Sequence, residues 1–180
     1  MNIRVLYEDN HIIAVYKPAG VLVQKDETGG QVLTEEVKKY LKDKYKKPGN
    51  VFLGMVHRLD RNVSGIILFG KTSKGASRLS EQFRSHSIKK IYHAVVEGEL
   101  SDKSGKLIHY SKKDELRRMA TVSDSPKEGY DQLELDYEVI KSNKKFSLIK
   151  INLKTGRFHQ IRVQFSSIGH PLVGDTKYGF

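Results

Sequence analysis

The sequence contains no cysteine among its 180 residues, and this absence excludes several kinds of chemistry. Without thiols the chain cannot form disulfides, hold an iron–sulfur cluster or a Cys-ligated zinc ion, or use a thiolate nucleophile. There is also no run approaching about 18 apolar residues, the length needed to span a bilayer. Residues 1–7 alternate like a strand instead of forming a charged segment followed by a long apolar run. These features favour a cytoplasmic protein with no membrane partner.

Acidic side chains are in the minority, with 21 Asp and Glu against 32 Lys and Arg and a net charge of +11. Such a balance attracts polyanions, so nucleic acid is the leading class of partner. Charge alone is also compatible with a ribosomal-type structural protein, a membrane-surface binder or a merely basic protein. With 38% hydrophobic residues, the length suits one core, and a single domain over residues 1–180 is expected.

Paired metal-ligand spacing is lacking as well. None of the seven histidines forms an H-E-x-x-H or similar pair, which argues against a metal site. Residues 169–174 contain two glycines but lack the Gly-Lys-Ser/Thr ending of a phosphate-binding loop and follow a helical pattern, so they indicate a structural turn.

Short runs rich in Ile and Val, bounded by turn residues, predict strands joined largely as hairpins. These strands are expected at residues 2–7, 11–16, 64–69, 90–96, 133–139 and 146–153. Residues 101–129 are polar and without clear period, and they predict a long excursion containing one hairpin. More strands than helices and more hairpins than crossovers indicate the α+β class, with a largely antiparallel sheet.

Helical spacing of apolar residues predicts three helices. The first is capped by Thr34, the second starts at about Ser73, and the third spans 156–168 and ends at Gly169. The apolar stripe of the first comprises Val37, Tyr40, Leu41 and Tyr45, and that of the third comprises Phe158, Ile161, Phe165 and Ile168. The lysine-rich face of the first helix is interpreted as a solvated surface.

A carboxylate stands between cationic side chains in residues 57–61, which read His-Arg-Leu-Asp-Arg. Nearby positive charge favours the ionised form of a carboxylate such as that of Asp60. An isolated Arg-x-Asp is more often a surface salt bridge. Here the surrounding residues decide between the two interpretations.

Five segments, in order along the chain, together resemble RluA-type pseudouridine synthases, which modify uridines in ribosomal and transfer RNA. The matching residues are 10–15 with 17–20, 56–60 with 64–69 and 71–72, 89–94, 155–162, and 169–175 with the following Tyr-Gly. Each match alone is weak, whereas five in the family's order are highly specific. The resemblance implies the family's catalytic-domain fold, with a mostly antiparallel central sheet flanked by helices.

Carried over position by position, the resemblance implies a cofactor-free isomerisation of uridine to pseudouridine in folded RNA. Asp60 would be the essential aspartate, and Arg162 would pair with it. Tyr92 would pack near the target base and assist proton transfer at C5. Arg58 would occupy the space left by the uridine when it leaves the RNA stack. The remaining RNA-contacting candidates are His57, Arg157 and His159.

Pattern alone supports plainer interpretations of these residues. Tyr92 shares a strand face with Ala94 and Val96, which is typical of a core tyrosine. Arg162 and His159 are equally compatible with capping or bridging surface carboxylates. The rival to an enzyme is a non-catalytic RNA-binding protein that kept the fold, and a third possibility is a basic structural protein of the ribosome.

Two departures from the family pattern stand out. Val63 occupies a position where the family usually has threonine, which should alter local hydrogen bonding without touching the Asp60 carboxylate. The family also continues past the final Gly-Asp…Tyr-Gly motif with a strand pair, whereas this sequence stops at Phe180. A shortened member, or a sheet edge covered by a second chain, is expected on that basis. Otherwise a monomer acting on RNA and not on DNA is expected.

Overall fold

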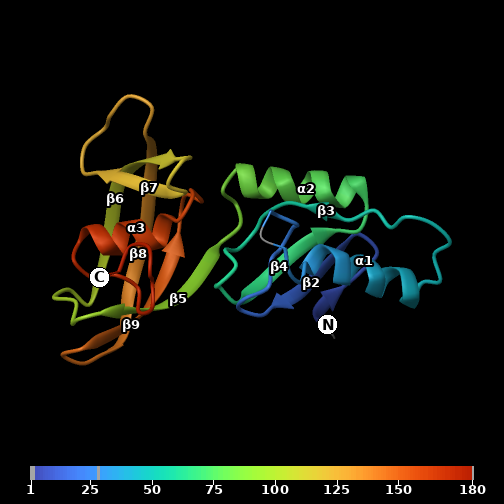
Figure 1. Cartoon of the computed structure of the whole chain (residues 1–180), viewed down its shortest axis with the longest axis horizontal. Coiled ribbons are helices and arrows are strands. Elements are labelled where there is room, and N and C mark those ends of the chain that lie inside the picture. Colours follow the sequence, from blue (N-terminus) through green and yellow to red (C-terminus); the bar gives the residue numbers. More distant parts are fainter. Residues whose placement is uncertain (1–2, 28, 180) are drawn as a thin grey trace. The chain divides into compact units, whose positions relative to one another are not determined.

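The computed structural model describes residues 3–27 and 29–179. The chain forms two compact units, residues 1–87 (unit 1) and 88–180 (unit 2). Each unit has its own antiparallel sheet (Figure 1). Among the described residues, buried apolar side chains form one cluster in unit 1 and two in unit 2. The prediction of a single domain over residues 1–180 stays a prediction. The α+β class with antiparallel strands is confirmed.

The sheet of unit 1 has four strands in the order β1-β2-β4-β3, and all neighbouring pairs are antiparallel. Its strands are β1 (Arg4–Glu8), β2 (Ile12–Lys17), β3 (Gly54–Met55) and β4 (Gly65–Gly70). Ile13 and Val15 pair with Phe69 and Ile67, and all four are fully buried. Because alternate residues share a face, this register creates one apolar face. The first three predicted strands are thereby confirmed, except that residue 2 lies outside the described part of the chain.

The helix α1 (Leu33–Lys44) covers this apolar face. Val37 and Leu41 of the predicted stripe are buried. Tyr45 is 46% exposed and follows the helix, so its assignment to the stripe is wrong. Its hydroxyl donates to Glu8 Oε1 at 2.7 Å, which links the end of α1 to β1.

The start of α1 differs from the predicted Thr34 cap. The N-cap position lies two residues earlier, at Val32, which makes no side-chain cap hydrogen bond. Carbonyls of Leu22 and Val23 accept the N–H groups of Leu33 and Thr34 at 2.8 and 3.1 Å. Tertiary backbone pairing thus satisfies donors that a capping side chain would otherwise take.

The helix α2 (Ser73–Arg84) begins where the sequence predicted it. Thr72 is the N-cap, and its hydroxyl oxygen accepts the Gly75 N–H at 3.0 Å. The helix packs against β3 and β4, and this approach depends on glycine. A Cβ on Gly70 would lie 2.5 Å from the backbone nitrogen of Ala76.

The sheet of unit 2 has five antiparallel strands in the order β5-β9-β8-β6-β7. They are β5 (Lys90–Glu97), β6 (Ser104–Asp114), β7 (Met119–Ser123), β8 (Asp131–Ser142) and β9 (Phe146–Leu153). Tyr92, Ala94 and Val96 pack with the core cluster, as their shared face predicted. The predicted strands at 90–96, 133–139 and 146–153 are confirmed.

The prediction of a long excursion over residues 101–129 is wrong. Its hairpin exists, but β6 is an eleven-residue strand inside the sheet, paired with β8 over residues 104–111 and with β7 over residues 110–114. Two core-facing positions of β6 are His109 and Ser111, which are 7% and 6% exposed. Polar residues on both faces of the strand hid the period of two by which strands are recognised.

The helix α3 (Gln160–Ser167) lies across one face of this sheet (Figure 1). It is shorter than the predicted 156–168, because His159 adopts a left-handed φ of 52° that delays the helix start. Gly169, with φ of 84°, follows the helix end as predicted. Phe165 is fully buried, whereas the other predicted stripe residues are only partly buried. No helix among the described residues is long and apolar enough to cross a membrane.

The glycine contact beneath α2 gives a stability prediction. Gly70→Ala should lower the free energy of unfolding by about 1–3 kcal/mol, because its Cβ forces α2 away from β4. The matched control is Gly49→Ala, since a Cβ at Gly49 meets no atom within 4 Å. Urea unfolding of both variants tests this, and equal midpoints would contradict the tight contact.

Candidate active-site residues

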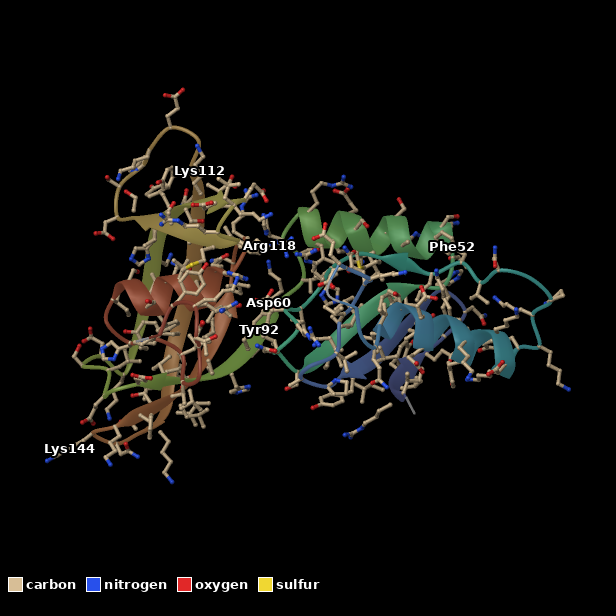
Figure 2. All side chains as sticks on the ribbon, viewed as in Figure 1. Phe52, Asp60, Tyr92, Lys112, Arg118 and Lys144 are labelled. Carbon is tan, nitrogen blue, oxygen red and sulfur yellow. The ribbon has the colours of Figure 1, made fainter. Side chains whose placement is uncertain are left out.

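Asp60 lies on the loop that joins β3 to β4 in unit 1 (Figure 2). Two neighbours anchor this loop. The Leu59 side chain packs against the unit 1 core, and the His57 ring stacks on Phe83 of α2 with centroids 4.6 Å apart. Arg58, which alternates with these anchors, is exposed, whereas Asp60 is partly buried. The alternation gives the loop fixed residues next to both predicted functional residues.

His57 also satisfies the backbone of β4. Its Nε2 accepts the Leu68 N–H at 2.9 Å, so the neutral ring carries its proton on Nδ1. Burial lowers the pKa of His57 to about 4, because the charged ring would lose its hydration. The ring therefore acts as a fixed, neutral acceptor near neutral pH. Its predicted contact with RNA stays a prediction.

Lys17 connects the turn after β2 to the loop of Asp60. The side chain is fully buried, and its Nζ donates to the carbonyls of Pro18, Val21 and Arg61 at 3.0, 2.8 and 3.0 Å. Burial lowers the pKa of Lys17, while the negative charge of Asp60 opposes this shift. The ammonium thus holds both loops together and places positive charge near Asp60.

The backbone reinforces the same connection. Gly20 N–H donates to Arg61 O at 2.8 Å, and Arg61 Nε donates to Gly20 O at 3.1 Å. A turn follows Asp60, whose carbonyl accepts the Val63 N–H at 3.1 Å. Val63 contributes to this turn through its backbone N–H.

In unit 2, Tyr92 lies on β5 opposite Ile151 of β9 and is partly buried against the core cluster (Figure 2). On the same strand face, Lys90 Nζ donates to the carbonyls of Lys154 and Thr155 at 3.3 and 3.2 Å. Burial lowers the pKa of Lys90. These bonds tie β5 to the segment that leads into α3.

Arg162 projects from α3 and makes a bidentate pair with Asp175. Its Nε and Nη2 donate to Oδ2 and Oδ1, both at 2.7 Å. The Asp175 side chain is only 4% exposed, so this is not the surface contact allowed by sequence pattern. The guanidinium also lies over the Tyr178 ring, 5.1 Å from its centroid. The predicted pairing of Arg162 with Asp60 joins residues of different units and stays a prediction.

The remaining candidates lie just before α3. Arg157 is exposed, and its Nη2 is 3.3 Å from Asp131 Oδ1. The His159 ring stacks on Phe158 with centroids 3.7 Å apart, and its Nδ1 is 2.9 Å from the Tyr178 hydroxyl. Their predicted contacts with RNA stay predictions.

Within the described part of the chain, no three His, Cys, Asp or Glu side chains are grouped as metal ligands. The polar groups gathered around Lys17 and Arg162 are instead engaged with protein partners.

The sequence matches the family model described as RNA pseudouridylate synthase over residues 11–167. The chain belongs to this family. The match covers both compact units, so the family's domain includes the loop of Asp60, strand β5 and helix α3.

Named relatives confirm the RluA-type resemblance. The chain is 35% identical over 189 residues to a tRNA pseudouridine synthase C of Haemophilus ducreyi, covering 99% of this chain and 75% of the relative. It is 35% identical over 176 residues to a ribosomal large subunit pseudouridine synthase C of Buchnera aphidicola, covering 98% of this chain and 54% of that relative. The chain thus spans three quarters of one relative and about half of the other.

Two solved structures share the fold. Human RNA pseudouridylate synthase domain containing 4 superposes with a TM-score of 0.82 at 21% identity, covering 98% of this chain and 69% of that one. Human RNA pseudouridylate synthase domain containing 1 superposes with a TM-score of 0.78 at 23% identity, covering 99% of this chain and 70% of that one. At these identities the likeness supports the pseudouridine synthase fold alone.

Sequence reasoning missed three residues that organise these family segments: Lys17, Gln160 and Asp175. Lys17 and Asp175 belong to segments that resemble the family, but the resemblance assigned neither of them a role. Gln160 and Gln164 are both buried, and their spacing of four marks one helix face. That spacing was the available signal, but glutamines are rarely expected to face a core.

The neutral His57 ring gives a pH-dependent prediction. Its folded pKa of about 4 lies below its ordinary 6.5, so its stabilising contribution is complete above pH 6.5 and declines as the pH falls towards 4. At about pH 5 this loss should be about 2 kcal/mol. His57→Gln retains an acceptor for the Leu68 N–H but does not titrate. Thermal unfolding at about pH 5 and above pH 6.5 should therefore show a smaller acid-induced loss of stability in the variant than in wild type. Equal losses of stability would contradict a buried neutral ring.

Proposed function

We propose that this protein converts uridine to pseudouridine in structured ribosomal or transfer RNA, with Asp60 as the catalytic carboxylate and without a cofactor. The observation that carries the proposal is the anchored loop of unit 1, within the family match. There a carboxylate lies on a segment held by His57, Leu59 and Lys17. A fixed loop suits a reaction in which a base must be detached and recaptured in a defined geometry.

The reaction requires one bond to be exchanged for another. The bond between N1 of uracil and C1′ of ribose breaks, a bond between C5 and C1′ forms, and the proton on C5 is removed while N1 gains one. Asp60 starts this exchange by attacking the sugar or base, or by removing a sugar proton. The positive charge of Lys17 lies nearby in either case.

Two residues of unit 2 complete the proposed chemistry. Tyr92 packs beside the target base and assists proton transfer at C5. Arg162 orients the Asp60 carboxylate and stabilises its charge. The support is their occurrence in the family match and the bidentate pair that holds the Arg162 side chain.

Access to the target requires the nucleotide to leave the RNA stack, which costs unstacking energy. Arg58 is exposed beside the partly buried Asp60, and we assign it to the space that the uridine vacates. His57, Arg157 and His159 are assigned to the RNA-facing segments, with His57 acting there through the loop that it anchors.

RNA is the proposed partner, and the net charge of +11 favours binding to its phosphates. The names of the two relatives refer to transfer RNA and to the large ribosomal subunit. We propose that the protein works as a monomer in the cytoplasm, on RNA and not on DNA.

Substitution of the carboxylate tests the function. Asp60→Asn should abolish pseudouridine formation while changing RNA affinity by no more than a few-fold, because shape and other charges are retained. The measurement is mass spectrometry of pseudouridine-labelled RNA from cells lacking the gene, rescued with wild type or variant. Asp136→Asn removes a partly buried carboxylate paired with Lys154 and serves as the charge-matched control. If the same pseudouridine sites are found after loss of the gene, the result would favour a non-catalytic RNA-binding protein.

Removal of Arg58 tests base flipping. Arg58→Ala should reduce the rate about 10- to 100-fold on a uridine in a stacked helix but much less on one in a flexible loop, since only the former must be unstacked. Arg84→Ala, which removes an exposed arginine of α2, controls for lost charge. Single-turnover rates on the two RNA substrates measure the difference, and an equal decrease on both would eliminate this role.

A further inference from the structure

The Asp175 carboxylate is buried, and both of its oxygens accept from Arg162. The two donor–acceptor distances are 2.7 Å, and the parallel Nε and Nη2 bonds fix the guanidinium plane. Burial alone would raise the pKa of Asp175, but the Arg162 bonds and two backbone N–H groups hold it below its usual value. The carboxylate therefore remains charged while buried.

The position of Asp175 is itself fixed by its own turn. Its Oδ1 accepts the N–H groups of Lys177 and Tyr178 at 3.0 and 3.2 Å, and its backbone N–H donates to Leu172 O at 3.0 Å. The Tyr178 hydroxyl then accepts the Ala120 N–H of β7 at 2.6 Å. The carboxylate is thus attached to the sheet of unit 2 through a short chain of hydrogen bonds.

The helix that carries Arg162 is fixed independently. Gln160 Nε2 donates to Glu134 O at 3.1 Å and to Gln164 Oε1 at 3.0 Å. Gln164 Nε2 in turn donates to Leu107 O at 3.2 Å. The backbone of Arg162 and the far end of its side chain are therefore both held to the same sheet.

We propose that Asp175 is a positioning residue, which holds the Arg162 guanidinium in the orientation that the isomerisation requires. This inference rests on the proposed function and on the role of Arg162 in it. Because the Nε edge is occupied by Asp175, a second acceptor must approach Arg162 from the Nη side. Asp175 therefore determines the direction from which the catalytic carboxylate or the RNA can contact the guanidinium.

A set of variants separates positioning from folding. Asp175→Asn keeps the size of the side chain but weakens the bidentate pair, and kcat should fall about 30- to 100-fold with KM within about three-fold, as expected for a misplaced catalytic group. Arg162→Lys keeps the charge beside Asp175 but cannot make two parallel bonds, and it should lose kcat to a similar extent. Asp136→Asn is the control for loss of a carboxylate in unit 2. Rates are measured on a transcript containing the site that wild type modifies, together with thermal unfolding midpoints.

The double variant provides the decisive comparison. Arg162→Met leaves a buried carboxylate unpaired, so adding Asp175→Asn should raise the unfolding midpoint without further lowering the residual kcat. A further loss of kcat in that background, or wild-type kcat in Asp175→Asn or Arg162→Lys, would overturn the positioning role. A decrease that merely follows the folded fraction would overturn it as well. If wild type forms no pseudouridine the proposed function fails, whereas an active wild type with an equally active Asp175→Asn rejects only this inference.

Discussion

A buried polar side chain must satisfy its hydrogen bonds inside the protein, and this constraint fixes the segments that carry the candidate site. Leaving such a group unpaired costs about 1–3 kcal/mol, and more when the group is charged. The Lys17 ammonium meets the constraint with three carbonyls, and the His57 ring meets it with one backbone N–H. Releasing the Asp60 loop would therefore leave buried polar groups unpaired, at the free-energy cost given above.

In unit 2, the need to pair buried polar groups fixes the helix α3 in the same way. Gln160 and Gln164 lie at the interface between α3 and the sheet, where apolar side chains would be ordinary. Their amides bond to backbone carbonyls of the sheet, and such bonds depend on direction in a way that apolar contacts do not. The apolar core positions α3 on the sheet, and the amides specify its rotation and height. Because Arg162 lies on α3, the same bonds fix the position of its backbone.

Charge contributes on two scales. The excess of basic residues over the whole chain favours an RNA partner through long-range attraction, which salt screens. Near the candidate site, the pairs are short and buried, so salt affects them little. The Arg162–Asp175 pair belongs to this second class. Distributed charge therefore favours RNA binding, whereas the buried pairs fix the geometry of the candidate site.

The sequence by itself determined the family, the α+β class and most of the strands, because these follow from local periodicity and from motifs with fixed spacing. Strand β6 was missed, since His109 and Ser111 occupy core positions that are normally apolar. The start of α1 was misplaced, because carbonyls of a distant turn replace its cap. Only the tertiary structure showed that Lys17 holds the Asp60 loop and that Asp175 holds Arg162. Those contacts depend on which backbone carbonyls and side chains meet after folding, and residue spacing along the chain does not encode that geometry.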